Sequence, residues 1–132
     1  NDYKNKEYKL ELKRPLNVEK ILRRATQMWF RLMEGEGSCM YYLGVRDNGE
    51  IVGLALEDGL IETLTNFSKI MTTLENEKKI ILVIKKISVY KCSSLNVSVN
   101  HSGKDSGGRY KEDIRYVLIF RIVLEGDGHG MV

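Results

Sequence analysis

The sequence predicts an α+β two-layer sandwich, in which two helices cover one face of a mostly antiparallel sheet. Three observations favour this fold class. Apolar residues recur at helical spacing in two segments, 18–34 and 57–76. Short segments typical of strands stand before, between and after them. The resulting order is β-α-β-β-α-β-β, and helices separated by pairs of strands indicate this architecture.

The N-terminal half begins with a strand and a helix. Residues 1–7 are polar and predict a disordered tail, whereas residues 8–12 alternate with period two and predict a short strand. Asn17 is a good N-cap for the following helix, and Gly35 a good end to it. One continuous apolar stripe runs along this helix: Val18, Ile21, Leu22, Ala25, Met28, Trp29 and Leu32.

A hairpin is predicted next, because Asn48-Gly49 separates two β-prone segments, 40–46 and 50–54. Gly44 and Gly53 lie within these two strands and indicate a bulge or close packing.

The C-terminal half holds the second helix and two more strands. The apolar face of helix 57–76 comprises Leu56, Leu60, Leu64, Phe67, Met71 and Leu74. Residues 80–90 predict a strand, and the continuous apolar run at 80–84 indicates a central one. Residues 91–112, rich in Ser and Gly, are interpreted as a mobile insertion in a single domain spanning 8–125. Alternation over 114–124 predicts the last strand, and 126–132 a loose C-terminal tail.

Composition limits the class of protein. A chain of 132 residues and 15.2 kDa fits one domain, with 42% hydrophobic and 30% charged residues. No apolar run is long enough to cross a membrane, and no secretory signal is visible. Two cysteines exclude a disulfide scaffold and a four-cysteine zinc site, so we expect a cytoplasmic protein. The first residue is Asn1 rather than Met, which indicates a piece of a longer protein.

Catalytic motifs are weak, and we expect no enzyme in this chain. Residues 102–106 (Ser-Gly-Lys-Asp-Ser) approach a phosphate-binding loop, but Asp105 replaces the required hydroxyl and Ser98 the upstream glycine. Cys39 or Cys92 with His101 or His129 would form a nucleophile pair, yet both histidines lie in Gly- and Ser-rich segments. No catalytic, cofactor-binding or metal-binding residue is therefore assigned.

The most suggestive surface is basic, in a chain of net charge +3. The candidate RNA or partner residues are Arg14, Lys20, Arg23, Arg24, Arg31, Lys85 and Lys86. Such a patch could contact RNA phosphates, although an ordinary solvated helix face, with a Glu19–Arg23 pair, is the favoured interpretation. It lacks interleaved aromatic residues, because Trp29, Tyr41 and Tyr42 are expected in the core.

Several segments in order resemble one family. They are Tyr8-Lys-Leu-Glu-Leu12, Ala25-Thr-Gln-Met-Trp-Phe-Arg-Leu32 with Glu34-Gly-Glu-Gly37, and Tyr42-Leu-Gly-Val-Arg-Asp-Asn-Gly-Glu-Ile-Val-Gly-Leu54. Together they resemble the N-terminal region of the GTP-binding protein one and two family, translational GTPases of the elongation factor Tu superfamily. Tyr116-Val-Leu-Ile-Phe-Arg121 resembles the strand that precedes the GTPase domain there.

The resemblance implies a non-catalytic accessory domain of an elongation factor-like GTPase. Its expected partners are its own GTPase domain, the ribosome, RNA and RNA-decay proteins, with no membrane. No cofactor is expected in this chain, whereas GTP and magnesium are expected in the missing GTPase domain. The sequence departs from the family after Glu125, where no phosphate loop follows. The hairpin Gly44-Val-x-Asp-x-Gly-x-Ile-x-Gly53 is also similar to Schlafen/AlbA-like domains, which implies a stand-alone nucleic-acid-binding module as the alternative.

Overall fold

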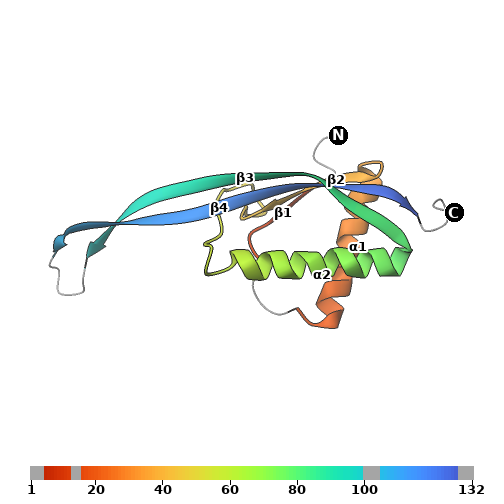
Figure 1. The fold of residues 1–132 in the computed structure, drawn as a ribbon, viewed down its shortest axis with the longest axis horizontal. Helices are drawn as coiled ribbons and strands as arrows, with labels where there is room; N and C mark the ends of the chain where they lie inside the picture. Colours follow the sequence, from red (N-terminus) through yellow and green to blue (C-terminus); the bar gives the residue numbers. More distant parts are fainter. Residues whose placement is uncertain (1–4, 13–15, 100–104, 128–132) are drawn as a thin grey trace.

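A computed structural model describes residues 5–12, 16–99 and 105–127, with the backbone alone for 94–99, 105–112 and 127. The elements are β1 (Lys6–Lys9), α1 (Val18–Glu34), β2 (Ser38–Leu43), α2 (Leu60–Lys78), β3 (Ile80–Val99) and β4 (Asp105–Asp127). The strand order is β1-β2-β4-β3; β1 and β2 pair in parallel, and the other two pairings are antiparallel. Both helices lie on one side of the sheet (Figure 1). The predicted α+β two-layer sandwich is therefore confirmed.

Helix α1 follows the sequence prediction closely. The Asn17 side chain accepts a hydrogen bond from the Lys20 backbone N–H at 2.8 Å, which satisfies a free amide of the first turn. At the other end, the Gly35 N–H donates to the Arg31 carbonyl at 3.0 Å. The apolar stripe buries Ala25, Met28 and Leu32 against the sheet and α2.

Helix α2 begins at Leu60, three residues later than predicted, because Gly59 adopts a φ of +120° that no helical residue has. Leu56 consequently lies outside the helix and is exposed. Phe67 is central to the core: its ring lies 5.2 Å from that of Tyr41 and 5.1 Å from that of Phe120. These contacts join α2 to β2 and β4.

The predicted turn at Asn48-Gly49 is present, but its second strand is not. The Gly49 N–H donates to the Arg46 carbonyl at 2.8 Å, and an isolated bridge joins Val45 to Ile51. Beyond it the chain crosses to β4, which it contacts through a single bridge between Leu54 and Tyr116. The prediction of a full strand at 50–54 is wrong, because the chain leaves the hairpin at Gly53 to reach β4.

Close packing of Gly44 and Gly53 makes this crossing possible, as predicted. Both have positive φ, +91° and +81°. A Cβ on Gly44 would lie 3.1 Å from the Gly53 Cα, and one on Gly53 would lie 2.7 Å from the Arg115 Cβ. Side chains at either position would push the loop away from β4.

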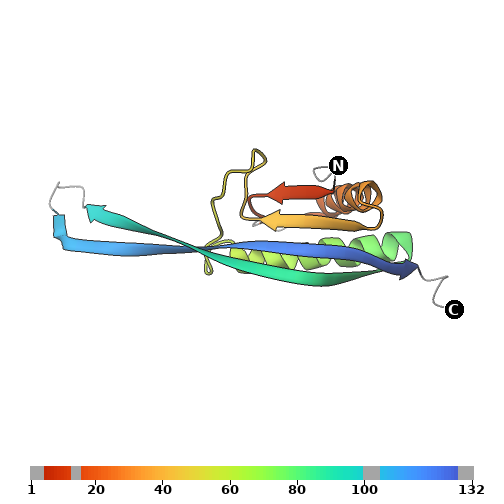
Figure 2. The ribbon, with the colours of Figure 1, turned by 90° about the horizontal axis from the view of Figure 1, so that it is seen from above.

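Strands β3 and β4 form one long antiparallel ribbon, which projects beyond the helices (Figures 1 and 2). The interpretation of 91–112 as a loop is wrong for the described residues, since 91–99 and 105–112 are strand. A two-stranded ribbon has no buried face, so its sequence needs no apolar alternation. The prediction that 80–90 is a central strand is also wrong, because β3 is the edge strand and β4 lies inside the sheet.

The chain ends also differ from prediction. Residues 6 and 7 of the predicted tail belong to β1, and the Met40 N–H donates to the Asn5 carbonyl at 2.8 Å. Gly126 and Asp127 belong to β4 rather than to a tail. In the part of the chain that the structure describes, no helix is long and apolar enough to cross a membrane.

Candidate functional site

The sheet has one face that no helix covers, and this open face is the first candidate site (Figure 2). Side chains alternate across a strand, so residues between buried core positions point to the open face. Phe120 and Ile122 are buried towards the helices, which places Arg121 and Ile119 on the open face. Their neighbours in register are Met40 and Lys86 beside Arg121, and Tyr42 and Ser88 beside Ile119.

Three tyrosines gather around a depression of about 370 Å³ on the open face. Tyr8 and Tyr42, opposite each other on β1 and β2, meet edge to face with ring centroids 5.2 Å apart. Tyr90 of β3 closes the far side and is 56% exposed. The remaining lining is mainly aliphatic and comes from the 45–51 loop and β4: Val45, Gly49, Ile51, Val117 and Ile119, with Cys92 of β3.

A cationic row crosses the same face next to the tyrosines. Lys6, Met40, Arg121 and Lys86 are successive partners across β1, β2, β4 and β3. The Lys6 Nζ lies 6.0 Å from the centre of the Tyr42 ring. Arg121 is exposed and donates from Nε to the Ser38 hydroxyl at 3.4 Å. We call these three cations and the three tyrosines (Lys6, Lys86, Arg121, Tyr8, Tyr42 and Tyr90) the open-face site.

The structure does not bring the sequence-predicted basic residues together. Lys20, Arg23 and Arg24 lie on α1, in the other layer of the fold. Arg31 pairs with two carboxylates, and Lys85 with Glu125 at 3.5 Å. Lys86 is exposed on the open face, and Arg14 lies outside the described residues. The predicted patch is thus divided between two sides of the molecule.

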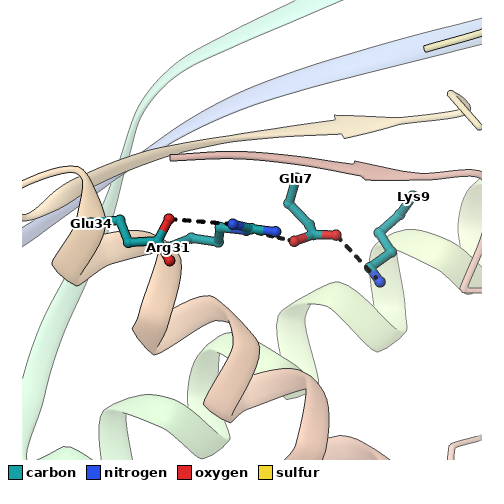
Figure 3. Close-up of polar contacts among 4 residues, drawn as sticks. All are labelled: Glu7, Lys9, Arg31 and Glu34. Carbon is teal, nitrogen blue, oxygen red and sulfur yellow. Dashed lines mark hydrogen bonds and ion pairs between the residues drawn. The ribbon is translucent and has the colours of Figure 1, made fainter. Parts of the chain in front are cut away.

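A charged network lies between β1 and α1 on the helix side (Figure 3). The Glu7 carboxylate is 9% exposed and accepts a hydrogen bond from Arg31 Nε at 2.8 Å. Lys9 Nζ lies 3.5 Å from the other Glu7 oxygen, and Arg31 also reaches Glu34 at 3.4 Å. The Glu7 hydrogen bond raises the pKa of Arg31, whereas burial lowers the pKa of Lys9. The Glu7–Arg31 pair ties β1 to α1, and we assign the network a structural role.

The cysteines and histidines do not form a visible catalytic pair. Cys39 is fully buried, and burial raises the pKa of its thiol to about 12, so it is a poor nucleophile at neutral pH. Cys92 lines the tyrosine depression. His101, His129 and Ser102–Lys104 lie outside the described residues. Within the described ranges, no cluster of three metal-ligating side chains occurs.

A second surface is an apolar groove of about 610 Å³ between α2 and β3. Leu64, Met71, Ile84 and Ile87 line it, and Phe120 lies at its base. Ile87 is 57% exposed although it points towards the helix side. Since β3 is the edge strand, the groove runs beside its unpaired backbone edge.

Sequence reasoning missed the tyrosines. Tyr41 is buried as predicted, but Tyr42 points to the opposite face, where it meets Tyr8. The available signal was the pair Tyr41-Tyr42, because adjacent residues of a strand cannot both face the core. Trp29 packs against the core from its margin, with Lys78 Nζ 4.9 Å from its ring centre.

Comparison with known proteins shows similarity over a short segment of this chain. The chain is 48% identical over 54 residues to GTP-binding protein 2 of mouse, and equally to the human protein of the same name. The matched segment covers 41% of this chain and 9% of each relative. No family model matches the chain. The chain is therefore similar to GTP-binding protein 2 over a short stretch of that protein's length.

Proposed function

We propose that this chain is a non-catalytic accessory domain of a translation-related GTP-binding protein, and that it docks on the GTPase region of such a protein. The observation that carries the proposal is the 48% identity to GTP-binding protein 2 over 54 residues. That stretch is 9% of the relative, so most of the relative lies outside it and is available as a docking partner.

The groove between α2 and β3 is the surface we assign to this docking. It combines exposed aliphatic side chains with an edge strand, the two features used when a partner adds a strand to a sheet. Soluble domains rarely leave such an edge uncovered unless a partner occupies it. Docking on the ribosome or on RNA-handling proteins is the second use we propose for the same domain.

The docking experiment compares two isoleucine variants of similar exposure. Ile87→Glu places a charge inside the groove, whereas Ile61→Glu, at 62% exposed on α2, lies outside the groove lining. The partner is human GTP-binding protein 2 lacking the matched segment, checked for retained GTP binding. We expect saturable association that Ile87→Glu weakens at least roughly tenfold and Ile61→Glu leaves unchanged. Equal loss in both variants, or no association at all, would contradict groove docking.

The non-catalytic part is tested separately by titrating this chain with GTP and magnesium in a calorimeter. We expect no saturable heat. Binding with micromolar affinity would contradict the assignment of GTP binding to another part of the protein.

A further inference from the structure

We propose that the open-face site binds single-stranded nucleic acid, with bases stacked on its tyrosines and phosphates held by its cationic row. This goes beyond the proposed function and does not depend on it, because the docking groove lies on the helix side of the sheet. The two proposals therefore fail separately.

The first argument is accessibility. Neither helix lies over the open face, and the 45–51 loop borders it on one side (Figure 2). The six residues of the site come from all four strands of one hydrogen-bonded sheet. Their backbone positions are therefore fixed before any ligand arrives, which lowers the entropy lost on binding.

The second argument is the aromatic lining. Nucleobases stack on exposed aromatic rings, and every base has such a face whatever its sequence. Tyr8 and Tyr42 meet at an interplanar angle of 74°, and both line the depression. Tyr90, from the other end of the sheet, is the most exposed of the three. The depression of about 370 Å³ falls in the size range of sites for small ligands such as a base.

The third argument is charge complementarity. The cationic row lies two residues along the strands from the Tyr8–Tyr42 row, a separation of about 7 Å. Bases on the tyrosines would therefore have their phosphates beside Lys6, Arg121 and Lys86. Two acidic groups near the site pair with cations, Glu50 with Arg46 at 3.3 Å and Glu125 with Lys85, whereas Asp47 of the 45–51 loop is exposed. The face keeps a positive balance across its centre.

Single-stranded nucleic acid fits these features better than a duplex or a protein. A duplex hides its base faces in the stack and would leave the tyrosines unused. A protein partner could cover the apolar depression. The row of three cations beside it is complementary in charge to a polyanion, such as a chain of phosphates. Unpaired RNA or DNA supplies stacking faces and phosphates together.

The experiment measures binding of a fluorescein-labelled oligouridine, roughly ten nucleotides long, by fluorescence anisotropy. With three phosphate contacts we expect the logarithm of Kd to rise with the logarithm of salt concentration at a slope of about 2. Tyr90→Ala should weaken binding about tenfold. Lys86→Glu with Arg121→Glu should weaken it further and reduce the slope to below about 1. An oligodeoxythymidine arm tests DNA, and a duplex of equal length should bind at least about tenfold more weakly.

The matched control moves the same charge change to the other layer. Lys20→Glu with Arg23→Glu alters two exposed cations of α1 and should leave Kd within about twofold at moderate salt. Trp29 lies on the helix side, so its fluorescence verifies that each variant is folded. Lys86 and Arg121 are exposed neighbours of like charge in the wild type. Two glutamates at these positions therefore repel each other no more strongly than the two cations they replace.

Three results would overturn the proposal. They are no oligouridine binding by the folded wild-type chain, loss of binding in the α1 variant but not in the open-face variants, and equal affinity for duplex. The Ile87→Glu variant separates the two proposals, because it should bind oligouridine like the wild type.

Discussion

Replacing Glu7 by Gln removes the β1 carboxylate that pairs with Arg31 of α1 and with Lys9 of its own strand (Figure 3). The glutamine can still accept one hydrogen bond, but the attraction to two cations is lost. Breaking a fully buried ion pair typically costs about 3–5 kcal/mol. Arg31 is 30% exposed and keeps Glu34 at 3.4 Å, so water and that carboxylate compensate part of the loss. We expect the free energy of unfolding to fall by about 2 kcal/mol.

The measurement is urea unfolding at pH 7, followed by the fluorescence of Trp29. Glu19→Gln is the matched control, because Glu19 pairs with Arg23 at 3.4 Å on the fully solvated side of α1. That change should cost under about 0.5 kcal/mol. If Glu7→Gln costs no more than the control, the network does not hold β1 in place. A double-mutant cycle with Arg31→Met should then also show no coupling.

Three further predictions concern stability and use urea unfolding followed by far-UV circular dichroism, because Trp29→Ala removes the chain's only tryptophan. Trp29→Ala should cost about 2 kcal/mol, less than a fully buried aromatic, because the indole packs at the margin of the core; a cost of 4 kcal/mol or more, on the order of full burial, would contradict this placement. Gly53→Ala should cost at least about 2 kcal/mol, since its Cβ would meet Arg115 at 2.7 Å, whereas Gly49→Ala, with a similar φ but open space, should cost about 1 kcal/mol. Burial raises the pKa of the Cys39 thiol in the folded state from 9.0 to about 12. The preference of the folded state for the protonated thiol is therefore fully present in the free energy of unfolding below pH 9, and it is lost as pH rises towards 12. At pH 10 this loss is on the order of 1 kcal/mol, and Cys39→Ala should lack it; identical pH profiles above pH 8 would refute the assignment.

Helix α1 could be predicted almost to the residue because its signals are local. Asn17 caps it, Gly35 ends it, and the apolar stripe between them repeats at helical spacing. The turn at Asn48-Gly49 is local in the same sense. The strand at 50–54 was predicted from composition. The close packing of Gly44 and Gly53 against β4, which is distant in sequence, instead lets the chain leave the hairpin.

Strand β1 shows why the faces of the sheet were harder to predict. Tyr8, Leu10 and Leu12 alternate and suggest a core face, yet the strand buries Glu7 and points Tyr8 outwards. A buried carboxylate is stable there because Arg31, 24 residues later, donates to it and Lys9 lies beside its other oxygen. No local pattern contains that pairing, so the outward direction of Tyr8 could not be assigned from the sequence alone.

Strand β3 explains how one thin sheet can serve two partners. Its apolar run at 80–84 is typical of a central strand, but only Ile80 and Leu82 are buried, whereas Ile81 and Ile84 are 37% and 36% exposed. Ile84 and Ile87 line the groove towards α2, whereas Lys86 and Tyr90 belong to the open face. A partner that adds a strand to the edge of β3 would use its backbone and the groove, and would widen the open face without covering it. Docking and nucleic-acid binding are then compatible on one domain, and a ternary complex of GTP-binding partner, this chain and oligouridine should form without competition.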